Sequence, residues 1–216
     1  MAASGLATLY DPAFEHDSCG FGLVAQIDGR ASSSLVDTAF AALAKLSHRG
    51  GVNADGVSGD GCGVLIHRPA DWLRALAAAD GIVPGERFAA GLVFLDPAGG
   101  EVAAIELERH LEEAGLALAG WREVAINTDA CGPLASATCP RVRQVFVNAA
   151  AGMDNDAFER ALFRARRRAE TALAGDPQFY VVSLSAQVIG YKAMAAPGRL
   201  REVFADLMHP ALASDA

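Results

Sequence analysis

The sequence contains few lysines, no strongly basic segment and no long apolar run. Lys45 and Lys192 are its only lysines, and 26 acidic residues against 18 Lys and Arg give a net charge of −8. Sequence-independent binding of nucleic acid needs a basic surface, as does docking on anionic membranes, so the charge argues against both. No run of about 18 apolar residues is present, so no transmembrane helix is expected.

The sequence also lacks the pattern of a secretory signal. The first basic residue is Arg30, so the positively charged region that begins such a signal is missing. We therefore expect a cytoplasmic protein. Apolar residues make up 52% of the 216 residues and charged residues 20%. This composition supports one folded domain and excludes wholesale disorder.

The four cysteines lack the spacing of a metal site. No pair is arranged as C-x-x-C, and no pair of histidines completes a zinc pattern. Disulfides are not expected in a reducing cytosol, so Cys62, Cys131 and Cys139 are interpreted as small buried apolar residues. Cys19 is different, because Gly20 and Gly22 follow it and indicate that some other group approaches the backbone closely there.

Apolar residues recur with periods of both two and 3.6 residues, which predicts strands as well as helices. Strands are expected over 19–27, 62–66, 88–95, 116–126, 142–147 and 179–184. Helices are expected over 34–47, 71–79, 101–114, 154–174 and 200–208. The arginines at 164 and 166–168 are interpreted as the solvated face of a helix rather than as a nucleic-acid contact. These elements predict a layered fold of helices and strands.

Residues 51–61 form a predicted loop rich in glycine and aspartate. It is not a phosphate-binding loop, because it lacks the Gly-Lys-Ser/Thr ending and its aspartates would repel phosphate. It is also not an EF-hand, because its acidic positions do not fit the twelve-residue spacing and no glutamate closes it.

Several motifs stand in one order along most of the chain. They are Asp17-Ser18-Cys19-Gly20-Phe21-Gly22, Leu46-Ser47-His48-Arg49-Gly50, Ala54-Asp55-Gly56, Gly59-Asp60-Gly61-Cys62-Gly63, Gly120-Trp121-Arg122 and Gln144-Val145-Phe146-Val147-Asn148. In this order the chain resembles the class II glutamine amidotransferases, and within them the N-terminal domain of glutamate synthase large subunits.

The resemblance implies an α+β fold of the N-terminal-nucleophile (αββα) type, incomplete at the C-terminus. Residues 1–18 would be a propeptide, and residues 19–216 the N-terminal part of the amidotransferase domain. Cys19 would be the nucleophile and its freed α-amine the base. Arg49 would orient the Cys19 backbone or the substrate, although an arginine at a helix C-terminus also stabilises the last carbonyls. His48 is expected to pack or cap, and Asp60 to support the loop.

The implied reaction releases ammonia from L-glutamine through a thioester on Cys19, for transfer to 2-oxoglutarate. The implied partners are the rest of the large subunit with its ammonia tunnel and a NADPH-oxidising small subunit. FMN and an iron–sulfur cluster are implied for the full-length enzyme, and no cofactor or metal for this chain. NADPH, NADH and ferredoxin types share this domain, and the resemblance leans to the NADPH type, mainly through the Leu9-Tyr10-Asp11 leader and the Gly59–Gly63 loop.

In the family, an Arg-Phe segment clamps glutamine and an Asn-Gly segment forms the oxyanion hole. Neither dipeptide occurs in residues 180–216, so no substrate-binding residue is assigned here. We therefore expect a fragment with little activity alone, whose sheets lack central strands.

Two other interpretations remain open at this stage. One is a non-catalytic remnant of the same fold that binds a partner; the missing segments favour it, while the intact Cys19 and His48-Arg49-Gly50 argue against it. The other is an N-terminal-nucleophile amidohydrolase for a different amide, such as an acylase. The resemblance over residues 140–184 argues against that alternative.

Overall fold

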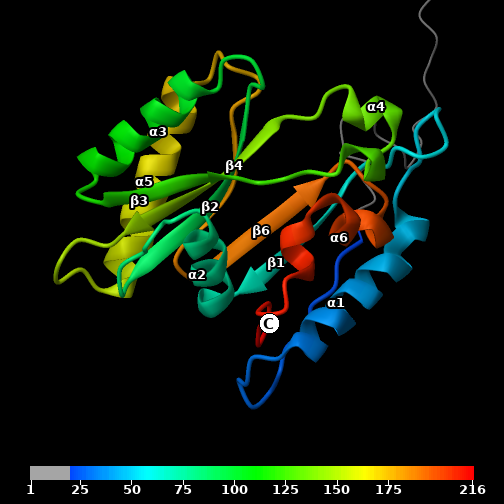
Figure 1. Ribbon diagram of the computed structural model, residues 1–216, viewed down its shortest axis with the longest axis horizontal. Coiled ribbons are helices and arrows are strands. Elements are labelled where there is room, and N and C mark those ends of the chain that lie inside the picture. The colour runs from blue at the N-terminus through cyan, green and yellow to red at the C-terminus, as the bar shows by residue number, and fades with distance from the viewer. Residues whose placement is uncertain (1–19) are drawn as a thin grey trace, which may run out of the picture.

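The computed structural model describes residues 20–216, in which two antiparallel sheets lie among helices (Figure 1). The helices are α1 (Ser33–Lys45), α2 (Ala70–Ala79), α3 (Glu101–Glu113), α4 (Pro133–Ser136), α5 (Asn155–Ala172) and α6 (Leu200–Val203). The strands are β1 (Cys62–His67), β2 (Phe88–Leu95), β3 (Ala117–Glu123), β4 (Arg141–Asn148), β5 (Tyr180–Ser185) and β6 (Val188–Ala193). Four short 3₁₀ helices, η1 (Leu46–Arg49), η2 (Thr128–Ala130), η3 (Pro197–Arg199) and η4 (Ala205–Met208), complete the described elements.

The larger sheet has the strand order β3-β4-β2-β5, and every neighbouring pair is antiparallel. Helices α3 and α5 lie side by side on one face of it (Figure 1). Side chains alternate along a strand, so Ala89 and Val93 of β2 pack with the helices while Ala90 and Leu92 pack into a second core on the opposite face. This sheet therefore has a buried core on each side.

The second core lies between the larger sheet, the two-stranded sheet β1-β6 and the helices α1, α2 and α6. Its aromatic centre contains Trp72, Tyr191 and Phe204, which are all essentially fully buried. Ring centroids are 5.8 Å apart for Trp72 and Tyr191, and 5.1 Å apart for Tyr191 and Phe204, which meet edge to face. Such aromatic pairs add to the stability gained from burial alone.

The helices predicted over 34–47 and 154–174 are confirmed as α1 and α5, and a side chain caps the start of each. Ser32 accepts a hydrogen bond from Leu35 N at the start of α1, and Asp154 accepts one from Ala157 N at the start of α5. Side-chain oxygens at these positions satisfy amides that have no partner within the helix. The arginines at 164, 167 and 168 are exposed, as expected for an outer face, and Arg166 and Arg167 pair with Glu170.

Two sequence-based predictions of secondary structure were wrong, and one strand was missed. Cys19 lies outside the described residues, and residues 20–27 form no strand. A strand at β6 was not predicted, although it pairs along the whole length of β1. The closing helix over 200–208 is broken at Phe204, whose extended backbone (φ −115°, ψ 102°) separates α6 from η4 and pairs with Ile126.

The C-terminal residues lie beside the start of α1 and the end of β1 (Figure 1). Gln26 N donates to the Asp215 carbonyl at 2.8 Å, and His67 N donates to the Ala216 carbonyl at 2.9 Å. The side chains of His67 and Asp215 also meet at 2.7 Å. Residues 214–216 therefore connect the segment before α1 with β1.

The mixed class of helices with antiparallel sheets is confirmed. The assignment to the N-terminal-nucleophile fold in particular stays a prediction at this point. Within residues 20–216, no helix combines the length and apolar character needed to span a membrane.

Candidate functional site

The described chain begins one residue after the predicted nucleophile, at Gly20. Cys19 and the predicted propeptide, residues 1–18, lie outside the described residues. Gly20 packs against the side chain of Arg49: a Cβ added at Gly20 would stand 3.1 Å from Arg49 Cγ and 3.2 Å from Arg49 Cβ. The structure thus brings the neighbour of Cys19 into contact with the second predicted site residue.

The end of α1 positions Arg49. After Lys45 the chain tightens into η1, and His48 Nδ1 donates to the Lys45 carbonyl at 2.9 Å. His48 therefore caps the helix, as the sequence predicted. Arg49 is exposed, and within residues 20–216 its guanidinium forms no ion pair. Within that range, no carboxylate neutralises its charge.

Asp60 holds the turn that follows Arg49. Its Oδ2 accepts a hydrogen bond from Gly51 N at 2.7 Å. A Cβ at Gly51 would stand only 2.4 Å from the same oxygen, so this contact requires a glycine. The supporting role predicted for Asp60 is confirmed, because its carboxylate fixes the backbone two residues after Arg49.

Asp55 anchors the middle of the loop to α4. Its carboxylate accepts hydrogen bonds from Val57 N at 3.0 Å, Ser58 N at 2.8 Å, Ser58 Oγ at 2.5 Å and Leu134 N at 3.2 Å. These donors, led by the Ser58 hydroxyl, hold the pKa of Asp55 far below its usual range. These hydrogen bonds therefore hold the loop predicted over 51–61 in one conformation.

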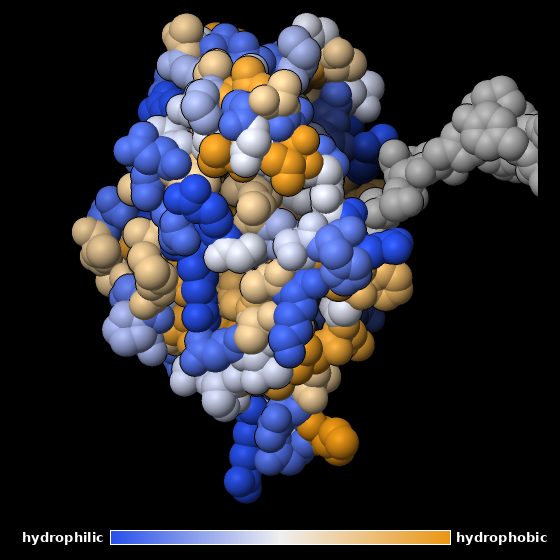
Figure 2. Space-filling model, turned by 90° about the vertical axis from the view of Figure 1, so that its right-hand side faces the viewer, coloured by the Kyte–Doolittle hydropathy of each residue, from blue (hydrophilic) through white to orange (hydrophobic). Residues whose placement is uncertain are grey.

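One cavity lies at the end of this loop and adjoins a second. The first, of about 410 Å³, has Asp60, Cys62, Phe94 and Lys192 among its lining residues. The second, of about 440 Å³, shares Phe94 and Lys192 with the first and extends toward α4. On the side of the molecule nearest α1 and α4, hydrophobic residues lie at the surface among hydrophilic ones (Figure 2).

The three other cysteines behave as the sequence predicted. Cys131 is buried, and Cys62 and Cys139 are partly buried, all as free thiols. Burial, reinforced by the neighbouring Cys131, raises the pKa of Cys62 to about 11. Burial likewise raises the pKa of Cys131 and of Cys139. These thiols stay protonated at neutral pH, so none of them is an activated nucleophile.

No group of three or more His, Cys, Asp or Glu side chains between Gly20 and Ala216 could hold a metal ion. The donor set in this part of the chain therefore does not fit an iron–sulfur cluster, which requires several cysteine thiolates at one site.

Sequence reasoning missed two polar clusters that shape this half of the molecule. In turns, Asp and Ser side chains commonly form hydrogen bonds with nearby backbone amides. The Asp55-Gly56-Val57-Ser58 pattern could therefore have predicted the hydrogen bonds of Asp55. The buried ion pair of Arg122 and Asp206 had no such signal, because the two residues lie far apart in the sequence.

Comparison with known proteins extends the resemblance to the whole described chain. The model of the family "Glutamine amidotransferases class-II" matches residues 19–216. The chain is 36% identical over 210 residues to the "Glutamate synthase [NADPH] large chain" of Bacillus subtilis (strain 168), which covers 95% of this chain and 14% of that protein. It is 36% identical over 220 residues to the large chain of Azospirillum brasilense, covering 99% of this chain and 14% of that protein.

A relative of another type is equally similar. "Ferredoxin-dependent glutamate synthase 2" of Synechocystis sp. is 37% identical over 209 residues, covering 93% of this chain and 13% of that protein. The chain thus spans about one seventh of the length of these relatives. Because the family match runs from the predicted nucleophile to the last residue, the chain belongs to the class II glutamine amidotransferases.

Proposed function

We propose that this chain carries the glutaminase half-reaction of a glutamate synthase, with Cys19 as the nucleophile. The observation that carries the proposal is the contact of Gly20 with Arg49, which sets two segments of the family motif side by side. The ordered motifs and the identity to glutamate synthase large chains support it. The leader and the Gly59–Gly63 loop favour the NADPH type.

The chemistry requires a base beside the Cys19 thiol. A thiol with a pKa of about 8.5 is only a few per cent ionised at pH 7. An α-amine has a pKa of about 7.7–8.0 and can accept the thiol proton directly or through a water. While Ser18 is bonded to Cys19, that nitrogen is a non-basic amide. Removal of residues 1–18 would therefore create the base without changing the nucleophile.

The reaction then proceeds by acyl transfer. The Cys19 thiolate forms a bond to the side-chain amide carbon of glutamine, and the α-amine holds the thiol proton. The tetrahedral intermediate breaks its carbon–nitrogen bond, and the nitrogen leaves as ammonia with that proton. Water then attacks the thioester, which yields glutamate and restores the thiol. Arg49, alongside Gly20, would orient the Cys19 backbone or the bound glutamine.

In the larger enzyme, the ammonia would pass through a tunnel to a second site that aminates 2-oxoglutarate. FMN and an iron–sulfur cluster would supply the reducing chemistry there, held by other parts of the large chain, and a NADPH-oxidising small subunit would deliver the electrons. We propose a cytoplasmic setting for this assembly.

We further propose that these residues form part of an αββα N-terminal-nucleophile domain. The two antiparallel sheets that share one buried core, with α3 and α5 on the other face of the larger sheet, support this assignment. The glutamine clamp and the oxyanion hole would come from segments other than residues 180–216, which contain neither Arg-Phe nor Asn-Gly. Oxyanion donors contribute about 2.7–4 kcal/mol each in comparable acyl-transfer sites, so a protein without these segments would hydrolyse glutamine poorly.

The test measures ammonia release from glutamine by the protein at the full length that its gene encodes. Cys19→Ser should lower kcat by several orders of magnitude, as loss of a nucleophile does in other acyl-transfer enzymes. Cys139→Ser, which changes a partly buried thiol that takes no part in the Gly20–Arg49 contact, should retain activity. Undiminished hydrolysis by Cys19→Ser would overturn the proposal, and absence of hydrolysis in the unmodified protein would favour a non-catalytic module.

A further inference from the structure

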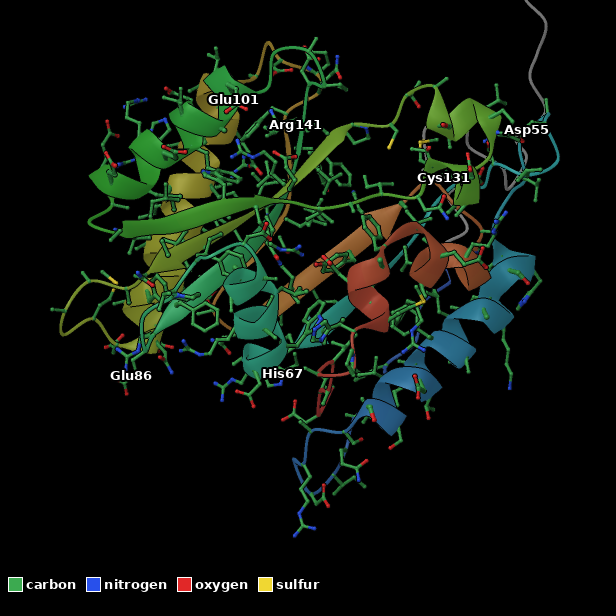
Figure 3. The ribbon with its side chains drawn as sticks, in the orientation of Figure 1. Asp55, His67, Glu86, Glu101, Cys131 and Arg141 are labelled. Carbon is green, nitrogen blue, oxygen red and sulfur yellow. The ribbon has the colours of Figure 1, made fainter. Side chains whose placement is uncertain are left out.

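A large cavity lies at the opposite end of the molecule from the Arg49 loop. It has a volume of about 770 Å³ and opens where β2 begins, where β4 ends and where the β5–β6 hairpin turns. In Figure 3 the labelled Glu86 and His67 lie toward this end, and the labelled Asp55 of the loop lies at the other. Its volume is within the range of about 300–1,000 Å³ that is typical of small-molecule sites.

The charge of the cavity is opposite to that of the whole chain. Arg68, Arg74 and Arg87 line it, and Glu86 is the only carboxylate among its lining residues. None of the three arginines forms an ion pair within residues 20–216. After the hydrogen bond with His67, Arg68 is close enough to Asp215 to contribute to the lowering of its pKa, but no carboxylate pairs directly with any of the three guanidinium groups in this part of the chain. In a chain with a net charge of −8, three such groups in one cavity require an explanation.

Two of these arginines also hold the cavity wall in place. Arg74 donates to the carbonyls of Pro84, Gly85 and Glu86 at 2.8–3.0 Å, and Arg87 donates to the Met153 carbonyl. Carbonyl oxygens accept hydrogen bonds from the guanidinium groups but carry no net charge, so the positive charge of Arg74 and Arg87 is not cancelled. The arginines therefore hold the cavity wall in shape and also give the cavity a positive charge.

Arg68 sits at this cavity in a conformation that its residue type disfavours. Its φ is +43°, and it is the one non-glycine residue between positions 20 and 216 with a positive φ. Arg68 N donates to the Gln187 carbonyl at 2.7 Å, and Ala70 N donates to the Arg68 carbonyl at 2.8 Å. The neighbouring Asp215 carboxylate is engaged by His67 at 2.7 Å. A glycine would adopt this backbone at lower cost, and strain of this kind concentrates at ligand sites.

Neutral donors complete the lining. Asn148, at the end of β4, accepts from Gly85 N through Oδ1 at 2.8 Å, which leaves its amide NH₂ group to donate. Gln187 and Asn155 also line the cavity, and residues 149–152 are small. Small residues allow a ligand to approach the backbone closely.

We propose that this cavity binds a small molecule carrying at least two negative charges on carboxylate or phosphate oxygens. Planar guanidinium groups match such oxygens in pairs of charge-assisted hydrogen bonds. Arg68 and Arg87 contact the anion, while Arg74 keeps the rim in shape. This site is separate from the proposed glutaminase chemistry and does not depend on it.

The experiment measures binding of two probes, inorganic phosphate and succinate, by titration calorimetry on the full-length gene product at constant ionic strength. The decisive variant is Arg68→Gly, which keeps the left-handed backbone and removes the guanidinium. It should weaken binding by about tenfold or more and leave the melting temperature equal to or above that of the unmodified protein. A stronger response to phosphate would identify a phosphorylated ligand, and a stronger response to succinate a dicarboxylate.

The matched control is Arg164→Ala, which removes an exposed arginine on α5 that has no ion pair in the described part of the chain. It should leave the affinity unchanged. The proposal would be overturned by absence of saturable binding of both probes. It would equally be overturned if Arg164→Ala weakened binding as much as Arg68→Gly.

Discussion

Gly20 contacts the aliphatic part of Arg49 so closely that a Cβ at position 20 would stand 3.1 Å from Arg49 Cγ. This separation is shorter than ordinary side-chain contacts, so the arginine must shift if the glycine is replaced. In the proposed mechanism both residues border the nucleophile, and a displacement of this kind changes the geometry of the reacting atoms.

The first prediction concerns this contact. Gly20→Ala should lower kcat/KM for glutamine hydrolysis by about tenfold or more, because small misplacements near reacting atoms are costly. Gly22→Ala is the control, since a Cβ there meets nothing within 4 Å, and it should retain most of the activity. Equal activity of the two variants would show that the Gly20–Arg49 contact has no catalytic consequence.

The second prediction concerns the Arg49 guanidinium itself. Arg49→Lys keeps the charge but loses the planar fork, and should lower kcat/KM by about tenfold. Because Arg49 is exposed, the free energy of unfolding should change by less than about 0.5 kcal/mol. Arg30→Lys, before α1, is the matched control. If Arg49→Lys lowered stability and left activity unchanged, the role of Arg49 would be limited to stabilising the end of α1.

The third prediction is a pH dependence that arises at Asp55. Its hydrogen bonds hold the pKa of the folded state below that of the unfolded chain. The carboxylate therefore stabilises the fold above about pH 4 and loses this effect as the pH falls toward the folded value. Asp55→Asn should flatten the decline of the unfolding free energy between about pH 5 and pH 2, measured by urea denaturation. Asp80→Asn, which alters an exposed carboxylate at the end of α2, should leave that profile unchanged.

The fourth prediction concerns the buried pair of Arg122 and Asp206. Arg122 also donates to Gln144 Oε1 at 2.6 Å, and the Tyr191 hydroxyl donates to Asp206 at 3.0 Å. Burial, together with the adjacent Asp206, raises the pKa of Tyr191 well above its usual range, so its hydroxyl remains a donor. Arg122→Ala should lower the free energy of unfolding by about 3–5 kcal/mol, because the Asp206 carboxylate would stay buried without its ion-pair partner. Tyr191→Phe should lower it by about 1 kcal/mol.

Denaturant unfolding of these variants checks the fourth prediction. Arg199→Ala breaks an exposed pair with Glu202 and serves as the control, with an expected cost below about 1 kcal/mol. A similar cost for Arg199→Ala and Arg122→Ala would contradict the central role of the buried pair.

The helices and most strands were predictable because their apolar residues repeat with a clear period. The segment 20–27 shows the limit of that reasoning. Phe21, Leu23 and Ile27 alternate as in a strand, yet all three are exposed, because a strand exists only where a neighbouring chain supplies hydrogen bonds. Among the residues that the structure describes, only Gln26 of this segment donates a backbone hydrogen bond to another part of the chain, at Asp215. Conversely, β6 contains Gly190 and Lys192, which weaken the alternation of apolar residues that predicts a strand. It nevertheless pairs with β1 along its whole length.

The candidate site was predictable where a local motif carried it. Arg49, Asp60 and Cys19 were singled out from short runs of sequence. The structure places Arg49 beside Gly20 and Asp60 on the Gly51 amide, and the catalytic roles of Cys19 and Arg49 stay predictions. The cavity around Arg68 was not predictable, because its arginines come from separate segments that only the folded chain brings together.

The most direct test of the account is the intact mass of the full-length protein before and after treatment with a glutamine-like diazoketone. We predict that the active protein lacks residues 1–18, and that one equivalent of the reagent attaches to Cys19 in parallel with loss of glutamine hydrolysis. An active protein that retains residues 1–18, or inactivation by attachment at another cysteine, would contradict the account.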